Sequence, residues 1–224
     1  MHTDDVVAAA HSLAAAGLVT AFGHVSVRKG TDEGQRGFLI TPPEPLGSLK
    51  PHEPLQEVPL TGDGLPDGVP KEAWIHRAIY DARPDVGAIC RAQPPVATAV
   101  VSGGLPIRVL HGQGAFLGRE VPVYGDARLI RERGAGEALA RSLGYAGGVV
   151  MRGNGAVTVG ADVGAAAARM WVLERSAEMN RDAASAGSPE PLSDEEFAYW
   201  ESVSEEILKR IWAYLQATPN LSEG

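Results

Sequence analysis

The 224-residue chain contains a single cysteine, Cys90, so it cannot form a disulfide within itself. This residue lies inside an apolar run, where a cysteine behaves as a small core side chain. The scarcity of cysteine agrees with a reducing compartment. We therefore expect the protein to be cytoplasmic.

The sequence also lacks a surplus of basic residues and a long hydrophobic run. Its formal net charge is −8 and no clustered basic face is visible, which argues against nucleic acid as a partner. No apolar run approaches membrane-spanning length, and the first residues are acidic where a secretory signal is positively charged. We expect neither a nucleic acid nor a membrane as a partner.

What is present is the composition of an ordinary globular domain, with 44% hydrophobic and 21% charged residues. The length suits one main domain, which we assign to residues 1–183. Residues 184–192 are rich in Ser, Gly and Pro and are expected to form a linker. Residues 193–224 are expected to form a terminal helix that packs on the domain or on a neighbouring subunit.

A helical pattern followed by a short apolar run occupies the middle of the chain, at residues 70–95. A proline-containing turn separates the two, and the apolar run is typical of a buried strand. This unit places Lys71 and Glu72 at the start of the helix, and Arg91 and Gln93 at the end of the strand. Residues at i and i+2 of a strand point the same way. We therefore expect Arg91 and Gln93 to face the same space.

The remaining segments alternate between strand and helix patterns without a strict strand-helix-strand repeat. Further strands are expected at residues 23–28, 38–41, 58–60, 105–110, 121–124, 148–151 and 156–159, and further helices at 4–16, 127–143 and 161–181. This mixture predicts an α/β protein with a mixed sheet and helices on both faces.

Several of these segments resemble the class II aldolase/adducin family, over nearly all of residues 4–181. The matching pieces are GLVTAFGHVSVR, FLITPP, EAWIHRAIYDARPDVGAI and VVMRGNGAVTVG. The resemblance implies a three-layer α/β/α sandwich around a central, largely antiparallel mixed sheet. It also implies a homotetramer with sites at the subunit borders, often completed by the terminal helix of a neighbour.

The chain differs from the family that it resembles at the positions of the family's metal ligands. Active members of the family bind zinc through a His-x-His pair and a third histidine, and a carboxylate at the preceding helix start transfers protons. Glu72 matches that carboxylate, but Arg91, Gln93 and Asn154 stand at the three histidine positions. A guanidinium is permanently cationic and amide oxygens are weak zinc ligands, so we expect no zinc there.

No other cofactor is expected from the sequence. The alternative is a divalent metal at a relocated site, held by some of Glu72, His76 and His111. In that case the protein would be a metal-dependent lyase or epimerase with new ligands.

Three residues are candidates for catalysis. Arg91 can replace the ion by binding a carboxylate and stabilising an enolate, although it could also simply pair with Glu72. Glu72 can give or take a proton, or it is only an acid at a helix start. His111 stands in a glycine-rich turn that cannot bury it in a core, which favours a role in the site.

Six further residues are candidates for substrate binding. His24 and Ser26 lie in the loop that contacts anions in the family, and Thr41 belongs to the same neighbourhood. Lys71 stands where the family often has a hydroxyl residue that touches a phosphate, so it either binds a carboxylate or is merely exposed. The polar replacements at the former metal positions, Gln93 and Asn154, complete the set.

These features predict a carbon-carbon lyase that acts on a small anionic substrate. The expected reaction is that of a zinc-independent decarboxylase or aldolase-like enzyme on a hydroxy, keto or hydroxyaromatic carboxylic acid. Such acids supply part of their own electron sink and depend less on a metal. The alternative of a different class is a non-catalytic module that binds a ligand or assists assembly, as the adducin head does.

Overall fold

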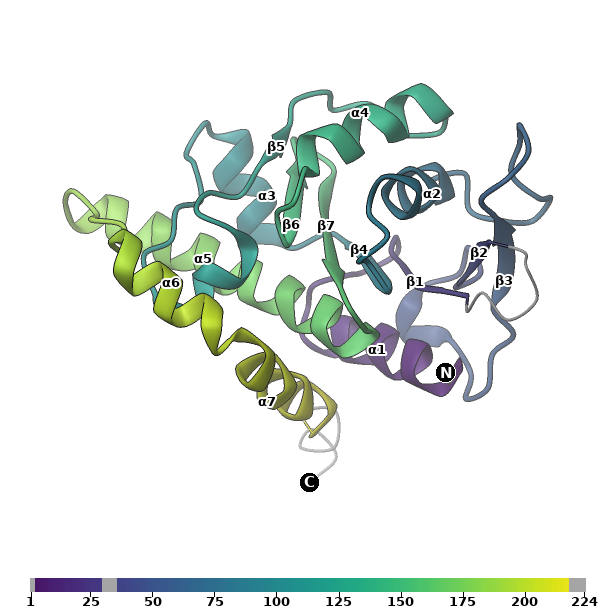
Figure 1. Cartoon of the computed structure of the whole chain (residues 1–224), viewed down its shortest axis with the longest axis horizontal. Helices are drawn as coiled ribbons and strands as arrows, with labels where there is room; N and C mark the ends of the chain where they lie inside the picture. The colour runs from purple at the N-terminus through teal and green to yellow at the C-terminus, as the bar shows by residue number, and fades with distance from the viewer. Residues whose placement is uncertain (1–2, 30–35, 218–224) are drawn as a thin grey trace.

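A computed structural model describes residues 3–29 and 36–217 (Figure 1). One sheet of seven strands has the order β3-β2-β1-β4-β7-β6-β5. All neighbours are antiparallel except β5 and β6, which are parallel. The strands are β1 (His24–Arg28), β2 (Gly37–Ile40), β3 (Gln56–Pro59), β4 (Ala88–Ala92), β5 (Val123–Tyr124), β6 (Gly148–Met151) and β7 (Gly155–Gly160). The predicted largely antiparallel mixed sheet is confirmed.

Helices cover both faces of this sheet and make the expected three layers (Figure 1). The helices α2 (Ala73–Ala82) and α4 (Arg133–Leu143) cover one face. The other face carries α1 (Thr3–Ala15), α3 (Pro95–Ser102) and α5 (Val163–Ala186), with α6 (Asp194–Ser202) and α7 (Ser204–Ala217) packed outside them. Two short 3-10 helices, η1 (Leu46–Ser48) and η2 (Gly112–Leu117), lie in the connections.

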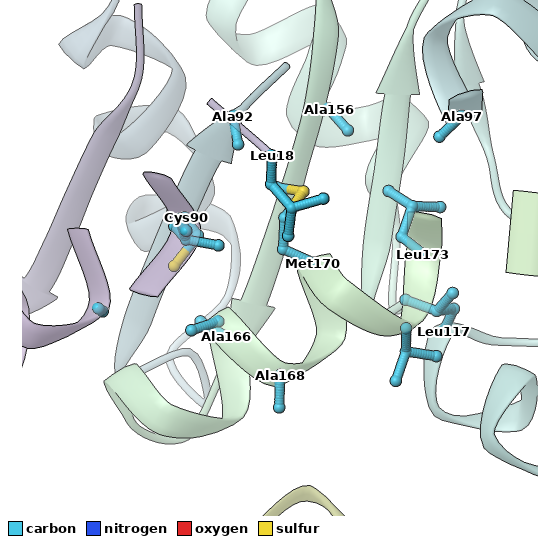
Figure 2. Packing of buried hydrophobic residues seen from close by; sticks show 14 of the residues in the cluster. Leu18, Cys90, Ala92, Ala97, Leu117, Ala156, Ala166, Ala168, Met170 and Leu173 are labelled. Atoms are coloured by element: carbon cyan, nitrogen blue, oxygen red, sulfur yellow. The ribbon is translucent and has the colours of Figure 1, made fainter. Parts of the chain in front are cut away.

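Alternation along β4 divides its side chains between the two cores. Cys90 and Ala92 pack in the core under α5, where Figure 2 shows them near Met170. Ile89 packs in the other core, beneath α2 and α4. Successive strand residues point to opposite faces, so Arg91 projects to the same side as Ile89. The central strand therefore delivers Arg91 to the α2 side of the sheet.

Two predicted elements differ from the structure. Residues 105–110 do not form a strand but make one isolated bridge, between Arg108 and Glu120. The backbone N–H and C=O of Arg108 are instead bound by the side chain of Asn180 on α5, at 3.0 and 2.9 Å. The helix predicted from residue 127 begins only at Arg133, which leaves residues 127–132 as a connection.

The C-terminal region also differs in detail from the expected single helix. Helix α5 continues to Ala186, into the predicted linker, and the following segment forms two helices separated at Val203. Trp212 packs on Gly164 of α5 within the same chain, and residues 218–224 lie outside the described part. No helix in residues 3–29 and 36–217 is both long and apolar enough to cross a membrane.

Candidate active site

A cavity of about 310 Å³ opens where the end of β4 meets the beginning of β1. The connections before α2 and α4 and after β2 close its sides. Its polar and aromatic lining comes from Phe22, His24, Glu44, Lys71, Glu72, Arg91 and Arg131. The sheet thus brings together residues that are more than 100 positions apart in the sequence.

Arg91 lies at the bottom of this cavity and is only 2% exposed. Its Nη1 donates to the backbone oxygen of Phe22 at 3.2 Å, and its Nη2 donates to the backbone and side-chain oxygens of Asn154 at 3.2 and 3.0 Å. A guanidinium has five N–H groups, so two of them, one on Nη1 and the one on Nε, have no protein acceptor among the described residues. Burial lowers the pKa of Arg91, and the charge of Glu72 raises it. The result is a fixed cation with donor capacity left for a ligand.

His24 stands directly opposite Arg91 in the antiparallel pairing of β1 with β4, and it also lines the cavity. Its side chain is 7% exposed. Burial, followed by the positive charge of Arg91, lowers the pKa of His24 to about 3. The imidazole is therefore neutral at physiological pH and can offer one donor and one acceptor.

Glu72 immediately precedes the first residue of α2, and its side chain makes no capping hydrogen bond there. Its nearest cation is Arg131, whose Nε lies 3.7 Å from Oε1. Glu72 is therefore within ion-pair distance of Arg131, whereas it acts on Arg91 through its charge, which raises the pKa of the guanidinium. Counting Lys71 as well, the lining carries three cations against the carboxylates of Glu72 and Glu44, a surplus of one positive charge. This balance suits an anionic ligand.

Two of the predicted substrate-binding residues lie beneath the cavity and not on its wall. Ser26 is fully buried and its hydroxyl is bonded to His76 Nδ1 at 2.7 Å and to the Tyr80 hydroxyl at 2.9 Å. Thr41 is also fully buried, and its Oγ1 accepts from the backbone N–H of Val25 at 3.2 Å. Both support the strand that carries His24.

The two amide residues are placed differently from each other. Asn154 belongs to the turn between β6 and β7 and holds the Arg91 guanidinium. Gln93 follows the last residue of β4, its backbone N–H donates to Leu18 at 2.9 Å, and it is not part of the cavity lining. Within this cavity, Arg91 and Gln93 do not share a wall.

His111 is not brought to the cavity within one chain. It immediately precedes η2, and its Nε2 is bonded to the Ser176 hydroxyl on α5 at 2.8 Å. The neighbouring η2 residues pack in the core under α5, on the face opposite to the one where Arg91 projects. Burial lowers the pKa of His111.

Three of the polar and aromatic lining residues were not predicted from the sequence. Arg131 lies in the segment that we expected to be helical, so no signal separated it from other helix-surface arginines. Glu44 follows a double proline in a stretch that reads only as loop. Phe22 is 66% exposed, and an apolar ring exposed beside a buried cation is visible only in three dimensions.

The residues present do not fit the zinc that the resemblance implies. The side-chain oxygen of Asn154 accepts from the Arg91 guanidinium, so two of the three former ligand positions bind each other. In residues 3–29 and 36–217, no group of three His, Cys, Asp or Glu side chains is positioned to hold a metal ion. The residues considered for a relocated metal site, Glu72, His76 and His111, are not brought together either. His76 is buried beside Ser26, and His111 lies on the opposite face of the sheet.

Comparisons with known proteins agree with the fold. The family model named Class II Aldolase and Adducin N-terminal domain matches residues 4–180 of the sequence. A 3,4-dihydroxyphthalate decarboxylase of Terrabacter sp. (strain DBF63) is 29% identical over 189 residues, covering 78% of this chain and 77% of its own.

Two solved structures are similar to this chain in three dimensions. L-fuculose 1-phosphate aldolase of Glaciozyma antarctica PI12 superimposes with a TM-score of 0.74 and 25% identity, over 96% of this chain and 85% of the other. The L-fuculose-1-phosphate aldolase of Thermus thermophilus superimposes with a TM-score of 0.68 and 30% identity, over 78% of this chain and 90% of the other. The chain therefore belongs to the class II aldolase/adducin family.

Proposed function

We propose that this protein is a zinc-independent lyase that decarboxylates a small hydroxyaromatic carboxylic acid. The observation that carries the proposal is the buried guanidinium of Arg91, fixed at the bottom of a cavity with a net positive lining. The similarity to a decarboxylase that is named for a dihydroxyphthalate substrate supports the same reaction class.

Arg91 would supply the positive charge that a metal supplies in relatives. A guanidinium presents a planar set of donors that matches a carboxylate or a phenolate oxygen. In a buried site such a charge costs no reorganisation when negative charge develops on the substrate. Lys71, exposed at the rim, would attract the acid and hold a second carboxylate if the substrate has one.

The bond changes are those of an aromatic decarboxylation. The bond between the ring carbon and the carboxyl carbon breaks, carbon dioxide leaves, and the electron pair remains with the ring and its hydroxyl oxygen. The carboxylate of Glu72 takes the proton of the substrate hydroxyl and delivers it to the ring carbon that loses the carboxyl group, and the phenolate product then takes a proton from water. His111 lies on the other face of the sheet, so in this proposal Glu72 is the proton donor.

The dimensions of the cavity suit a substrate with one ring. Its volume of about 310 Å³ is at the small end of ligand sites in proteins. Phe22 is exposed and lines the same cavity as Arg91, so its ring offers an apolar face against which an aromatic acid can stack. A hydroxyaromatic acid uses both features, whereas an aliphatic keto acid uses only the cation.

The test is a screen of hydroxyaromatic and keto acids for carbon dioxide release, with Arg91→Ala and Arg91→Lys beside the wild type. Both variants should lose at least about 100-fold in kcat/KM, because lysine keeps the charge but not the planar fork. Arg210→Ala, on the exposed surface of α7, is the control and should retain full activity. A wild type that binds these acids without releasing carbon dioxide would indicate the binding module instead, and unchanged turnover in folded Arg91→Ala would refute the role of Arg91.

A further inference from the structure

Three buried nitrogen atoms beneath the cavity have no protein hydrogen-bond partner in the described residues: His24 Nδ1, His76 Nε2 and Arg91 Nε. Their side chains are 7%, 0% and 2% exposed. His24 and Arg91 are opposite each other in the sheet, and the rings of His24 and His76 are 6.0 Å apart in an edge-on arrangement. Buried polar atoms in native proteins are nearly always bonded, to protein or to ordered water. Three neighbouring side chains therefore each carry a buried nitrogen that lacks a partner.

The hydrogen-bond chain behind His76 sets the direction of its protons. The Tyr80 hydroxyl is fully buried and its one partner in the described chain is Ser26 Oγ, at 2.9 Å. If Tyr80 donates to Ser26, the hydroxyl proton of Ser26 is free to be donated to His76 Nδ1, at 2.7 Å. The opposite direction would leave the Tyr80 proton buried without an acceptor. His76 Nδ1 is thus the acceptor, and its proton resides on Nε2.

The cluster then contains two donors and one further ring nitrogen. His76 Nε2–H and Arg91 Nε–H both need an acceptor, and His24 Nδ1 is an acceptor when the His24 proton is on Nε2. A water molecule accepts two hydrogen bonds and donates two others, so the hydrogen-bonding capacity of a single water matches these three atoms. If the His24 proton were on Nδ1 instead, all three atoms would be donors, which is more than the two hydrogen bonds that one water accepts.

We infer that Tyr80, Ser26 and His76 are positioning residues that, through one buried water shared with Arg91, hold His24 as an Nε2–H donor toward the cavity. The three side chains do not line the cavity, whereas His24 does. Two neutral histidines next to a guanidinium are compatible with this arrangement, because burial and the charge of Arg91 lower the pKa of both. His24 then presents a fixed donor beside the free Nη1–H of Arg91.

This inference rests on the proposed function for its catalytic meaning. Two adjacent donors of fixed direction match two neighbouring oxygen atoms of one substrate, as in an aromatic acid whose hydroxyl is next to the carboxyl group. A histidine with the other tautomer would present a lone pair to the same oxygen atoms and repel them. The substrate class is thereby narrowed to ortho-hydroxy aromatic acids, with the meta and para isomers expected to be poorer substrates.

The structural part of the inference is tested without any substrate. A high-resolution crystal structure should contain an ordered oxygen about 3 Å from each of the three nitrogens. Long-range ¹H–¹⁵N NMR correlations of ¹⁵N-histidine-labelled protein should find both His24 and His76 protonated on Nε2. A proton on Nδ1 of either ring, or three nitrogens with no oxygen between them, would overturn it whether or not the protein is a decarboxylase.

The functional part uses a matched pair of variants at His76. Glutamine places an amide nitrogen near the position of Nε2, whereas asparagine places it near Nδ1, so only His76→Gln retains the donor to the water. On an ortho-hydroxy acid that the wild type decarboxylates, His76→Gln should keep a kcat at least about tenfold higher than His76→Asn, with similar KM values. Equal kcat values in two folded variants, judged by thermal unfolding, would contradict the positioning role.

Discussion

Arg91 Nη2 donates a hydrogen bond of 3.0 Å to the side-chain oxygen of Asn154, and a second one of 3.2 Å to its backbone oxygen. These residues stand at two positions where the resemblance places zinc ligands. In the proposed function, a cation held by an amide replaces the ion that the resemblance implies. The proposed chemistry depends on that replacement, since the cation, unlike a metal, cannot be removed or exchanged.

The contact between Asn154 and Arg91 predicts different kinetic effects for two substitutions. Asn154→Ala removes the acceptor that holds the guanidinium, so kcat should fall by about tenfold through loss of orientation. Asn154→Asp keeps the oxygen but adds a negative charge that neutralises the cavity, so mainly KM for an anionic acid should rise. Steady-state kinetics of both variants checks this, and identical effects would show that Asn154 does not orient Arg91.

Glu72 is expected to be the proton donor. Glu72→Gln keeps the size of the side chain but cannot transfer a proton, so kcat should fall by about 100-fold or more, in the range of general acid catalysis. Glu44→Gln is the matched control, because Glu44 lines the same cavity and is exposed, and it should change kcat by less than about threefold. A large loss of kcat in Glu44→Gln with no loss in Glu72→Gln would mean that Glu44, and not Glu72, is the proton donor.

The buried His24 makes stability depend on pH. Its pKa in the folded protein is lowered to about 3, below the ordinary 6.5, so the unfolded chain binds its proton first as the pH falls. Stability from this group is therefore complete above pH 6.5 and is lost as the pH falls toward 3. Between pH 7 and 5 the loss from His24 alone is roughly 2 kcal/mol.

Urea unfolding of the wild type and His24→Gln at the two pH values measures this contribution. The variant should lose less free energy of unfolding on acidification than the wild type does. His76 remains in both proteins, and its pKa stays lowered in each because burial is the largest cause. Equal losses in the two proteins would mean that His24 is not held neutral.

Most of the sheet and its flanking helices follow from local patterns. The alternation in β1, the continuous apolar runs of β4 and β6 and the proline before β4 all predicted elements within a few residues of their observed bounds. Glu72 and Arg91 were expected at a helix start and a strand end, and both line the cavity. These signals are local, so a single sequence contains them.

What could not be predicted depends on contacts between distant segments. Asn180 captures the backbone of Arg108, so an apolar run with strand character does not become a strand. Arg131 reaches the cavity because α4 begins late, at a residue with no distinctive capping pattern. Ser26 reads as a residue on the exposed side of a half-buried strand, yet α2 covers it with His76 and Tyr80.

The packing of α7 on α5 predicts different effects for two glycine substitutions. A Cβ at Gly164 would lie 2.7 Å from the Trp212 ring, whereas one at Gly134, in α4, would meet nothing within 4 Å. Gly164→Ala should therefore lower the free energy of unfolding by about 1–3 kcal/mol. Gly134→Ala should leave it unchanged or raise it by up to about 1 kcal/mol, because alanine favours helix. Thermal or urea unfolding distinguishes them, and a stable Gly164→Ala would mean that α7 does not pack on its own α5.

The metal content of the active protein tests whether Arg91 takes the place of a metal ion. Purified protein would be assayed for decarboxylation before and after exhaustive treatment with a chelator, and its transition metals would be quantified by elemental analysis. We predict far less than one metal ion per chain and undiminished activity after chelation, since Arg91 provides the positive charge. One tightly bound zinc per chain, with activity that is lost on its removal and restored by its return, would contradict the account.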